Sequence, residues 1–217
     1  MGTLNYQNAN EAHKEIVKTW RMKLFGPSRR DVWNALAAEI GARMEKGDWA
    51  KSDRVLLEVS PCWHMVLDLE QQGKVTYTRM RAPFVNVDGL RFRVYRKSIF
   101  SNLAKKLGMQ DIEVGDPFFD DKFIVKSNQP ERVRQLLRNK RVRRLIEKQP
   151  KVYLHVLDDE GWFGAKFPDG VDELRFSVPG VITDIKVLKA LFLLFVETLE
   201  QLHRMGTTKA VWTGVKL

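Results

Sequence analysis

The stretch "WHMVLDLEQQGKVTYTRMRA", residues 63–82, decides the fold, because its hydrophobic residues recur at every second position. The alternating apolar residues of its first half are Trp63, Met65, Leu67 and Leu69. Such alternation is typical of a half-buried β-strand, and "QQGK" at 71–74 supplies a turn before a second alternating run. The stretch therefore predicts an antiparallel hairpin with one face in the core and the other in water.

The same turn predicts a register and leads to a third strand. If "QQGK" sets the register, the opposed pairs are Asp68 with Tyr77, Val66 with Arg79, and His64 with Arg81. The run "LRFRVYRKS" at 90–98 follows the turn "NVDG" and also alternates. We therefore expect a three-stranded antiparallel meander in the first half of the chain.

Two helical patterns precede this meander. The first, over 8–26, leads into "GPS", after which Ser28 can cap a second helix over 29–47, with Asp31 as the acid of a capping box. The apolar residues that recur every four positions in the second helix are Val32, Leu36, Ile40 and Met44. This stripe predicts that the second helix packs against another element.

The second half of the chain again passes from helix to strand. A short helix is predicted at 98–108, short extended pieces with an acidic turn over 109–128, and two amphipathic helices within 131–148. Three alternating runs then predict a second meander, at 151–157, 161–167 and 173–178. A long apolar helix follows, capped by Thr183 or Asp184 and ending at about Met205.

This order of elements predicts an α+β fold. It comprises N-terminal helices, two antiparallel three-stranded meanders separated by short helices, and a long C-terminal helix packed on a sheet. We expect residues 1–217 to form a single globular unit, with a subdivision into 1–108 and 109–217 as the alternative. The sequence leaves open whether the two meanders share one sheet.

The composition is that of a folded globular protein, because 44% of the 217 residues are hydrophobic and 29% are charged. The single Cys62 cannot form an intrachain disulfide and favours a reducing compartment. The first residues lack the pattern of a signal peptide, and the longest apolar run, 190–196, is too short to span a membrane. We therefore expect a soluble, cytoplasmic protein without a transmembrane segment.

The chain is basic, and a net charge of +10 permits attraction to an anionic polymer or to an acidic protein partner. Residues 131–148 hold eight Lys or Arg against two Glu, yet their apolar residues recur at helical spacing. The charges therefore favour the solvated faces of two helices. In the nucleic-acid alternative, four helix arginines would border a basic sheet: Arg134, Arg138, Arg141 and Arg144.

The sheet in that alternative would interleave aromatic and guanidinium groups on one face, as sheet-based RNA binders do. The residues that would form this face are Tyr77, Arg79, Arg81, Arg91, Arg93 and Tyr95. Asp68 and Glu70 would lie on the same face and partly neutralise it. Because arginines on exposed strands also prevent edge-to-edge aggregation, both interpretations stay open.

No catalytic, cofactor or metal site is predicted. Cys62 and His64 share a strand face, but no oxyanion-hole motif or orienting acid accompanies them. The acidic residues within 111–121 do not follow the spacing of a calcium loop, and favour a capped turn or salt bridges to the Arg-rich helices.

An apolar pocket is a further alternative. A meander followed by a long apolar helix resembles helix-grip proteins, in which sheet and helix enclose a cavity. The residues that would line this cavity are Phe163, Phe167, Phe176, Phe192 and Phe195. The simpler interpretation is that these rings fill the core.

The block "GDPFFDDKFIVKSN" at 115–128, followed by a short leucine-rich helix, resembles a family of uncharacterised bacterial domains. The residues that carry the resemblance are Gly115, Asp116, Pro117, Phe119, Asp120, Phe123, Val125, Lys126, Ser127 and Asn128. The likeness extends over about residues 105–203. Because the family has no assigned activity, the resemblance implies a bacterial cytoplasmic protein but no site residues. We therefore expect a non-enzymatic, soluble binding or interaction protein with no cofactor.

Overall fold

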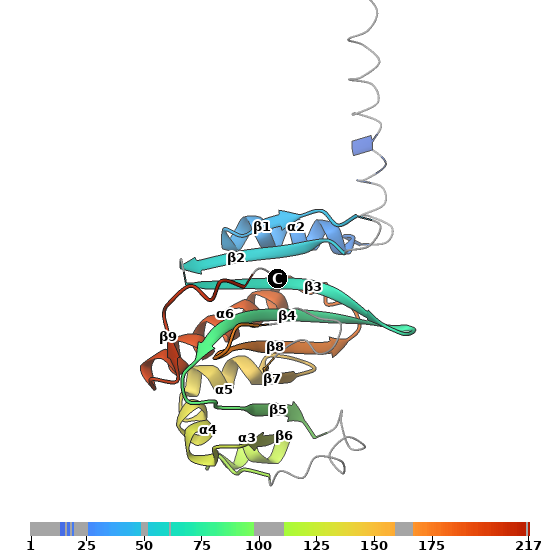
Figure 1. Ribbon diagram of the computed structural model, residues 1–217. Coiled ribbons are helices and arrows are strands. Elements are labelled where there is room, and N and C mark those ends of the chain that lie inside the picture. Colours follow the sequence, from blue (N-terminus) through green and yellow to red (C-terminus); the bar gives the residue numbers. More distant parts are fainter. Residues whose placement is uncertain are drawn as a thin grey trace, which may run out of the picture.

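The structure is a computed structural model that describes residues 14, 15, 17, 19, 26–48, 52–60, 62–97, 111–158, 167–215 and 217 (Figure 1). Among these residues, nine strands form one sheet whose ladders are all antiparallel. The strands are β1 (Arg43–Glu45), β2 (Arg54–Ser60), β3 (Trp63–Gln72), β4 (Val75–Asn86), β5 (Phe92–Arg96), β6 (Phe123–Ser127), β7 (Tyr153–Leu157), β8 (Val171–Pro179) and β9 (Thr208–Lys209). Their order is β1-β2-β3-β4-β8-β7-β5-β6, and β9 pairs with β4. The described strands of both halves of the chain therefore belong to one sheet.

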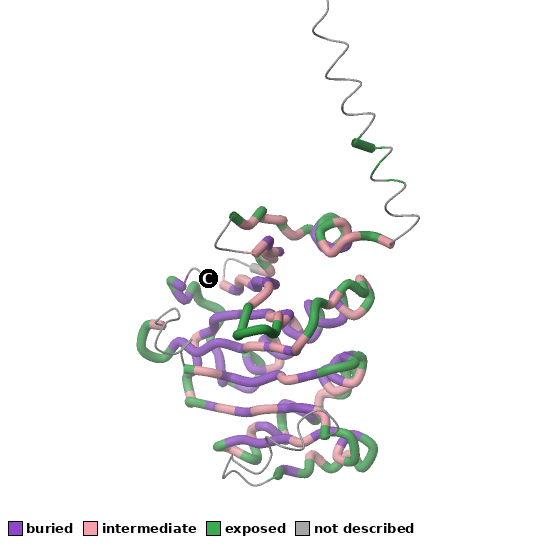
Figure 2. The backbone as a smooth tube through the Cα atoms, turned by 90° about the vertical axis from the view of Figure 1, so that its right-hand side faces the viewer, coloured by how far each residue is buried: buried purple, intermediate pink, exposed green. Residues whose placement is uncertain are grey.

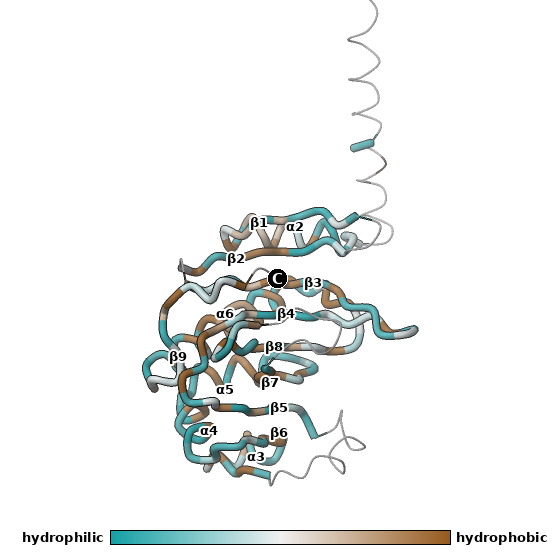
Figure 3. The backbone as a smooth tube through the Cα atoms, viewed as in Figure 1, coloured by the Kyte–Doolittle hydropathy of each residue, from teal (hydrophilic) through white to brown (hydrophobic). Residues whose placement is uncertain are grey.

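The helices cover one face of this sheet. They are α2 (Arg29–Ile40), α3 (Pro117–Lys122), α4 (Pro130–Leu137), α5 (Lys140–Glu147) and α6 (Ile185–Arg204). The long helix α6 contacts α2, α4 and α5, and its hydrophobic residues lie behind the strands in the view of Figure 3. The predicted α+β class and the long C-terminal helix on a sheet are confirmed. No helix of the described part of the chain combines the length and the hydropathy needed to cross a membrane.

A single row of side chains explains why the helices take this face. The residues that lie opposite one another from β1 to β6 are Met44, Val55, Leu67, Met80, Phe176, Leu154, Val94 and Val125. Seven of these eight are buried, Met44 is half-buried, and all pack in one cluster with the apolar side of α6. In Figure 2 the buried residues run through the middle of the strands. The sheet has thus a continuous apolar face that must be covered.

The capping box predicted for α2 is confirmed. The Ser28 side chain accepts from the backbone of Asp31, and the Asp31 side chain accepts from the backbone of Ser28. The predicted end of this helix at 47 is wrong, because Gly41 takes φ 69° and its N–H bonds the carbonyl of Ala37. Met44 therefore joins the core from β1 instead of from the helix.

The predicted hairpin is confirmed, but its register is wrong by two residues. The structure pairs Asp68 with Arg79, Val66 with Arg81, and Glu70 with Tyr77. The reason is the turn: Gln72 pairs with Val75, so Gly73 and Lys74 form the loop, and Gly73 supplies the positive φ of 59°. A slip of two residues preserves the face of every side chain, so the predicted core and polar faces hold.

The predicted position of the third strand is wrong. β5 pairs with β6 and β7, and β8 takes the place beside β4. Asn86 explains why the chain leaves the edge of β4, because its side chain bonds both the N–H and the carbonyl of Leu90 and closes a turn. The nine residues of β8 also bring Leu174 and Phe176 onto the apolar face.

Several predicted elements lie largely outside the described residues. These are the first helix, of which residues 14, 15, 17 and 19 are helical, the helix at 98–108, and most of the strand at 161–167. Phe167 is described and is not part of a strand. β7 pairs directly with β8.

Asp53 ties the start of α2 to the connection between β1 and β2. Its buried carboxylate accepts hydrogen bonds from Arg29 (2.9 Å), from Arg30 (2.7 and 2.9 Å) and from the N–H of Gly47 (3.0 Å). The hydrogen bond from Arg30 is the main reason that the pKa of Asp53 lies well below its ordinary range.

We expect Asp53→Asn to destabilise the protein at pH 7 and to lose this effect in acid. A carboxyl with a depressed folded pKa stabilises the fold above its unfolded pKa of about 4, and this contribution is lost as the pH falls toward the folded value. Urea unfolding of both proteins between pH 7 and pH 3 measures the difference. A difference that stays constant across this range would contradict the role given to Asp53.

Candidate functional site

The face of the sheet opposite the helices is polar and basic. The row that runs across it in register from β3 to β6 is Val66, Arg81, Arg175, His155, Arg93 and Lys126. Like charges directly opposite each other on neighbouring strands are destabilising. Each cation in this row therefore needs an anion close to it, either a carboxylate of the protein or a bound ion.

Asp68 is the anion for the β3–β4 end of the row. It accepts hydrogen bonds from Arg79 (2.8 and 2.9 Å) and from Arg81 (2.7 Å), and Arg79 also reaches Glu70 at 3.0 Å. Burial raises the pKa of Asp68, but the hydrogen bonds and charges of the two arginines outweigh burial, so this pKa lies below its ordinary value. The cluster is ionised and internally neutralised.

Three further cations of this face also have carboxylate partners. Arg175 pairs with the fully buried Glu173 at 2.6 Å, and Lys126 lies 3.4 Å from Asp111. The partners of Arg91 are Asp158 and Asp172, each at 3.1 Å. In each of these ion pairs the cation and the carboxylate occupy each other. The paired groups therefore have little capacity left to bind a ligand.

The residues proposed from the sequence for nucleic-acid binding do not lie on one exposed surface. Tyr77, Arg79 and Arg81 are on β4, whereas Arg93 and Tyr95 are on β5, and β8 and β7 lie between these strands. Only 14% of the Arg79 side chain and 6% of that of Arg81 are exposed, and Tyr95 is buried. The predicted adjacency fails because β5 does not follow β4 in the sheet.

The four helix arginines lie on the opposite side of the sheet, with α4 and α5. Arg134 donates to the carbonyl of Glu113 and pairs with Glu131, and Arg141 pairs with Glu197 at 3.0 Å. Arg138 and Arg144 are exposed. The helix and sheet arginines therefore do not converge on one nucleic acid.

Three of the five rings proposed for an apolar pocket lie in the core. Phe176, Phe192 and Phe195 are buried in the main cluster between the sheet and α6. Phe167 is half-buried, and Phe163 lies outside the described residues.

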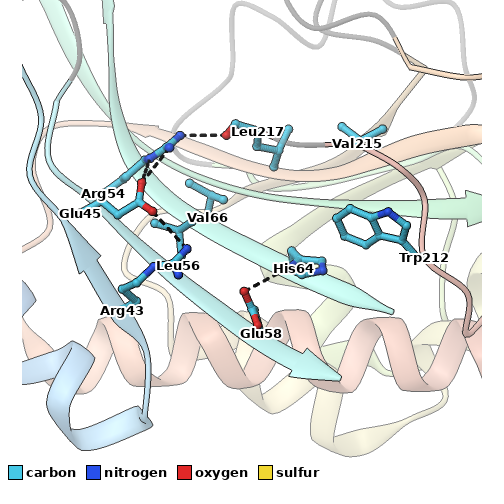
Figure 4. A pocket seen from close by; sticks show the side chains of 10 residues that line it. All are labelled: Arg43, Glu45, Arg54, Leu56, Glu58, His64, Val66, Trp212, Val215 and Leu217. Atoms are coloured by element: carbon cyan, nitrogen blue, oxygen red, sulfur yellow. Dashed lines mark hydrogen bonds and ion pairs between the residues drawn. The ribbon is translucent and has the colours of Figure 1, made fainter. Parts of the chain in front are cut away.

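A hollow of about 290 Å³ opens on the polar face over β1, β2 and β3 (Figure 4). We call it the β1–β3 hollow, and its lining residues are Arg43, Glu45, Arg54, Leu56, Glu58, His64, Val66, Trp212, Val215 and Leu217. The strands supply its floor and rim. The segment that follows β9 returns across the sheet and supplies Trp212, Val215 and Leu217.

The floor of the hollow is apolar, because Leu56 and Val66 are neighbours in the β2–β3 ladder. One side of the rim is a chain of polar contacts. Glu45 accepts from Arg54 at 2.8 Å, and Arg54 also donates to the main-chain oxygen of Leu217 at 2.8 Å. Arg43 lies 3.1 Å from Glu45. The hydrogen bond from Arg54 to Leu217 links β2 to the segment after β9, which we call the returning segment.

The other side of the rim is aromatic. The rings of His64 and Trp212 meet edge to face with centroids 4.3 Å apart. His64 Nδ1 lies 3.9 Å from Glu58, which is beyond hydrogen-bond length. Trp212 is 46% exposed although it lines the hollow. The two arginines and two glutamates of the hollow cancel in charge, so the hollow favours an uncharged amphipathic group.

The thiol and the acidic residues that the sequence singles out take part in contacts within the chain. The thiol of Cys62 donates to the carbonyl of Ala210 at 2.9 Å. No group of three or more metal-ligating side chains occurs within the described residues. Of the acidic residues within 111–121, Asp116 caps α3 and pairs with Arg143, and Asp120 accepts from the N–H groups of 114–116.

Sequence reasoning did not find this hollow. It placed His64 and Val66 on a strand, but it did not predict the strand at 54–60 that carries Leu56, and it assigned no role to the residues after the last helix. The available signal was the short segment 211–217, whose Val211, Trp212 and Val215 are apolar residues that follow a completed helix. Such residues indicate a segment that packs back on the protein.

Comparisons with known proteins leave the function open. No family model matches the chain, and no curated protein matches it. A solved structure, that of the mycobacterial trehalose monomycolate transport factor A, TtfA, aligns with a TM-score of 0.43 and 9% identity over 85% of this chain and 96% of that chain. We draw no functional conclusion from a likeness at this level. The absence of a characterised match is consistent with the resemblance to a family without assigned activity.

Proposed function

We propose that this chain is a non-enzymatic protein-interaction module that holds one apolar or aromatic side chain of a protein partner in the β1–β3 hollow. The observation that carries the proposal is an apolar floor, Leu56 and Val66, bounded by polar side chains whose charges already cancel. Such a site gains free energy from apolar contact and orients its ligand by hydrogen bonds at the rim.

The size of the hollow suits a group no larger than a single side chain or a small metabolite. Small-molecule sites usually range from about 300 to 1,000 Å³, and the hollow has about 290 Å³. The exposed ring of Trp212 is an aromatic anchor of the kind enriched where proteins bind each other.

The edge of the sheet next to the hollow supports an extended partner. β1 pairs with Arg54, Val55 and Leu56 of β2, but β2 continues to Ser60. Within the described residues, the outer edge of 57–60 has no neighbouring strand. An extended peptide could add there as a strand and place a side chain against Glu58 and His64. The two nucleic-acid surfaces have less support, since Arg79, Arg81 and Arg91 of the sheet are paired with carboxylates.

We expect blocked amino-acid amides, as stand-ins for a partner side chain, to bind in the hollow. N-acetyl-tyrosine amide and N-acetyl-leucine amide should shift the His64 ring resonances saturably, with a Kd of about 1 mM, which corresponds to about 4 kcal/mol. Trp212→Ala should weaken binding by about fivefold, because an aromatic contact is worth about 1 kcal/mol.

The matched control is Val211→Ala. Val211 is equally exposed at 46% and adjacent in sequence, but it does not line the hollow. Its removal should leave binding unchanged. The proposal fails if His64 shows no saturable shift, or if the Val211 and Trp212 variants lose affinity equally.

A further inference from the structure

The basic row on the polar face contains one cation whose charge the described structure does not offset. Arg81 is paired with Asp68, Arg175 with Glu173, and Lys126 with Asp111. Arg93, by contrast, makes no side-chain hydrogen bond or ion pair with any described residue. It lies directly between His155 on β7 and Lys126 on β6. The centre of the row is therefore electropositive.

His155 adds an unused polar atom at the same place. The residue is only 5% exposed, and its Nδ1 has no hydrogen-bond partner among the described groups. Native proteins rarely leave a buried ring nitrogen without a partner, because the group has lost its hydration. The ring is held by Tyr153, whose centroid is 4.5 Å away. A buried polar atom beside an unpaired guanidinium indicates a missing acceptor.

The charged and titratable groups that surround His155 come from every neighbouring strand. Arg93 lies opposite on β5, Arg175 and Glu173 are on β8, and Tyr153 is on the same strand. Lys126 stands one strand further, beyond Arg93. Burial, followed by the charges of Arg175 and Arg93, lowers the pKa of His155 to about 3. The imidazole is neutral at pH 7, so one ring nitrogen can carry a proton and donate it.

We propose that Arg93 and His155 form the centre of an anion-binding site for the phosphate or carboxylate group of a small ligand. Arg93 is half-buried, so solvent ions can reach it, and its planar guanidinium offers two parallel donors to such a group. A neutral His155 donates from Nδ1, and Lys126 and Arg175 strengthen the local positive field. This site is separate from the β1–β3 hollow and does not depend on its occupant.

The proposal predicts a response of His155 to inorganic phosphate or to acetate, tested in separate titrations of the full chain at pH 7 in low-chloride buffer. Ring ¹⁵N resonances of His155 should shift saturably with at least one anion. Phosphate, which stays anionic in acid, should also raise the pKa of His155, since it offsets part of the repulsion from Arg93 and Arg175. Comparison of the two titrations distinguishes phosphate from carboxylate as the preferred group.

The variants are Arg93→Gln, Arg93→Lys and the control Arg138→Gln. Arg138 is an exposed cation on the opposite side of the sheet. Arg93→Gln should lower the affinity at least tenfold, Arg93→Lys should retain part of it, and Arg138→Gln should match the wild type. The proposal is overturned if neither anion shifts His155 saturably in the wild type, or if the Arg138 variant loses as much affinity as Arg93→Gln. The wild-type titration decides the matter even if Arg93→Gln does not fold.

Discussion

Replacing Asp68 by Asn is expected to lower the free energy of unfolding by about 3 kcal/mol, because it removes one partner of a buried ion cluster. The side chains of Arg79 and Arg81 are 14% and 6% exposed, and both donate to this carboxylate. An uncharged amide can accept a hydrogen bond but cannot balance two guanidinium charges. The loss lies at the lower end of the usual range because Arg79 keeps its contact with Glu70. Urea unfolding at pH 7 measures it.

The control for this prediction is Glu39→Gln. Glu39 pairs with Lys189 at 2.6 Å, but the two side chains are 47% and 45% exposed. Exposed pairs contribute about 1 kcal/mol or less, so this variant should be nearly as stable as the wild type. Equal losses for the two variants would show that the cluster around Asp68 is no more important than a surface ion pair.

Replacing Phe176 by Ala is expected to cost about 3–5 kcal/mol, the usual range for removal of a large buried ring. Phe176 is fully buried and lies between Met80 on β4 and Leu154 on β7, in the middle of the apolar row. Its loss leaves a cavity between the sheet and α6 that the neighbouring strands cannot close. Denaturant unfolding at constant pH measures the effect.

Phe118→Ala is the matched control, because Phe118 is 60% exposed on α3 and contacts Lys122 through its ring face. Surface substitutions usually change stability by about 0.5 kcal/mol or less. A cost for Phe176→Ala no larger than this would indicate that the ring already borders open space. That result would favour the helix-grip alternative, in which Phe176, Phe192 and Phe195 line a cavity.

The local patterns of the sequence predicted the elements because those patterns depend on near neighbours. Ser28 and Asp31 form the predicted capping box since both partners lie within one helical turn. The faces of β3 and β4 were also correct despite the error in register, because Gly73 moved the pairing by an even number of residues.

The candidate sites could not be predicted from local sequence patterns, because their residues are far apart in the sequence. Arg93 and His155 are 62 positions apart in the sequence and become cross-strand neighbours only in the folded sheet. The β1–β3 hollow likewise combines Leu56 and Val66 with Trp212, which reaches them through the returning segment. No periodic pattern in the local sequence indicates that either set of residues comes together.

The sequence by itself determined the α+β class, the long terminal helix and which side chains of each strand face the core, since the alternation of apolar residues specifies a face wherever one side is buried. Only the tertiary structure decided that β8, and not β5, lies beside β4. This order of strands also decides which charged side chains become neighbours. The physical reason is that strand neighbours depend on the apolar area buried between distant segments, set against the entropy of closing the loops between them. That balance depends on the whole chain and cannot be predicted from any single stretch of it.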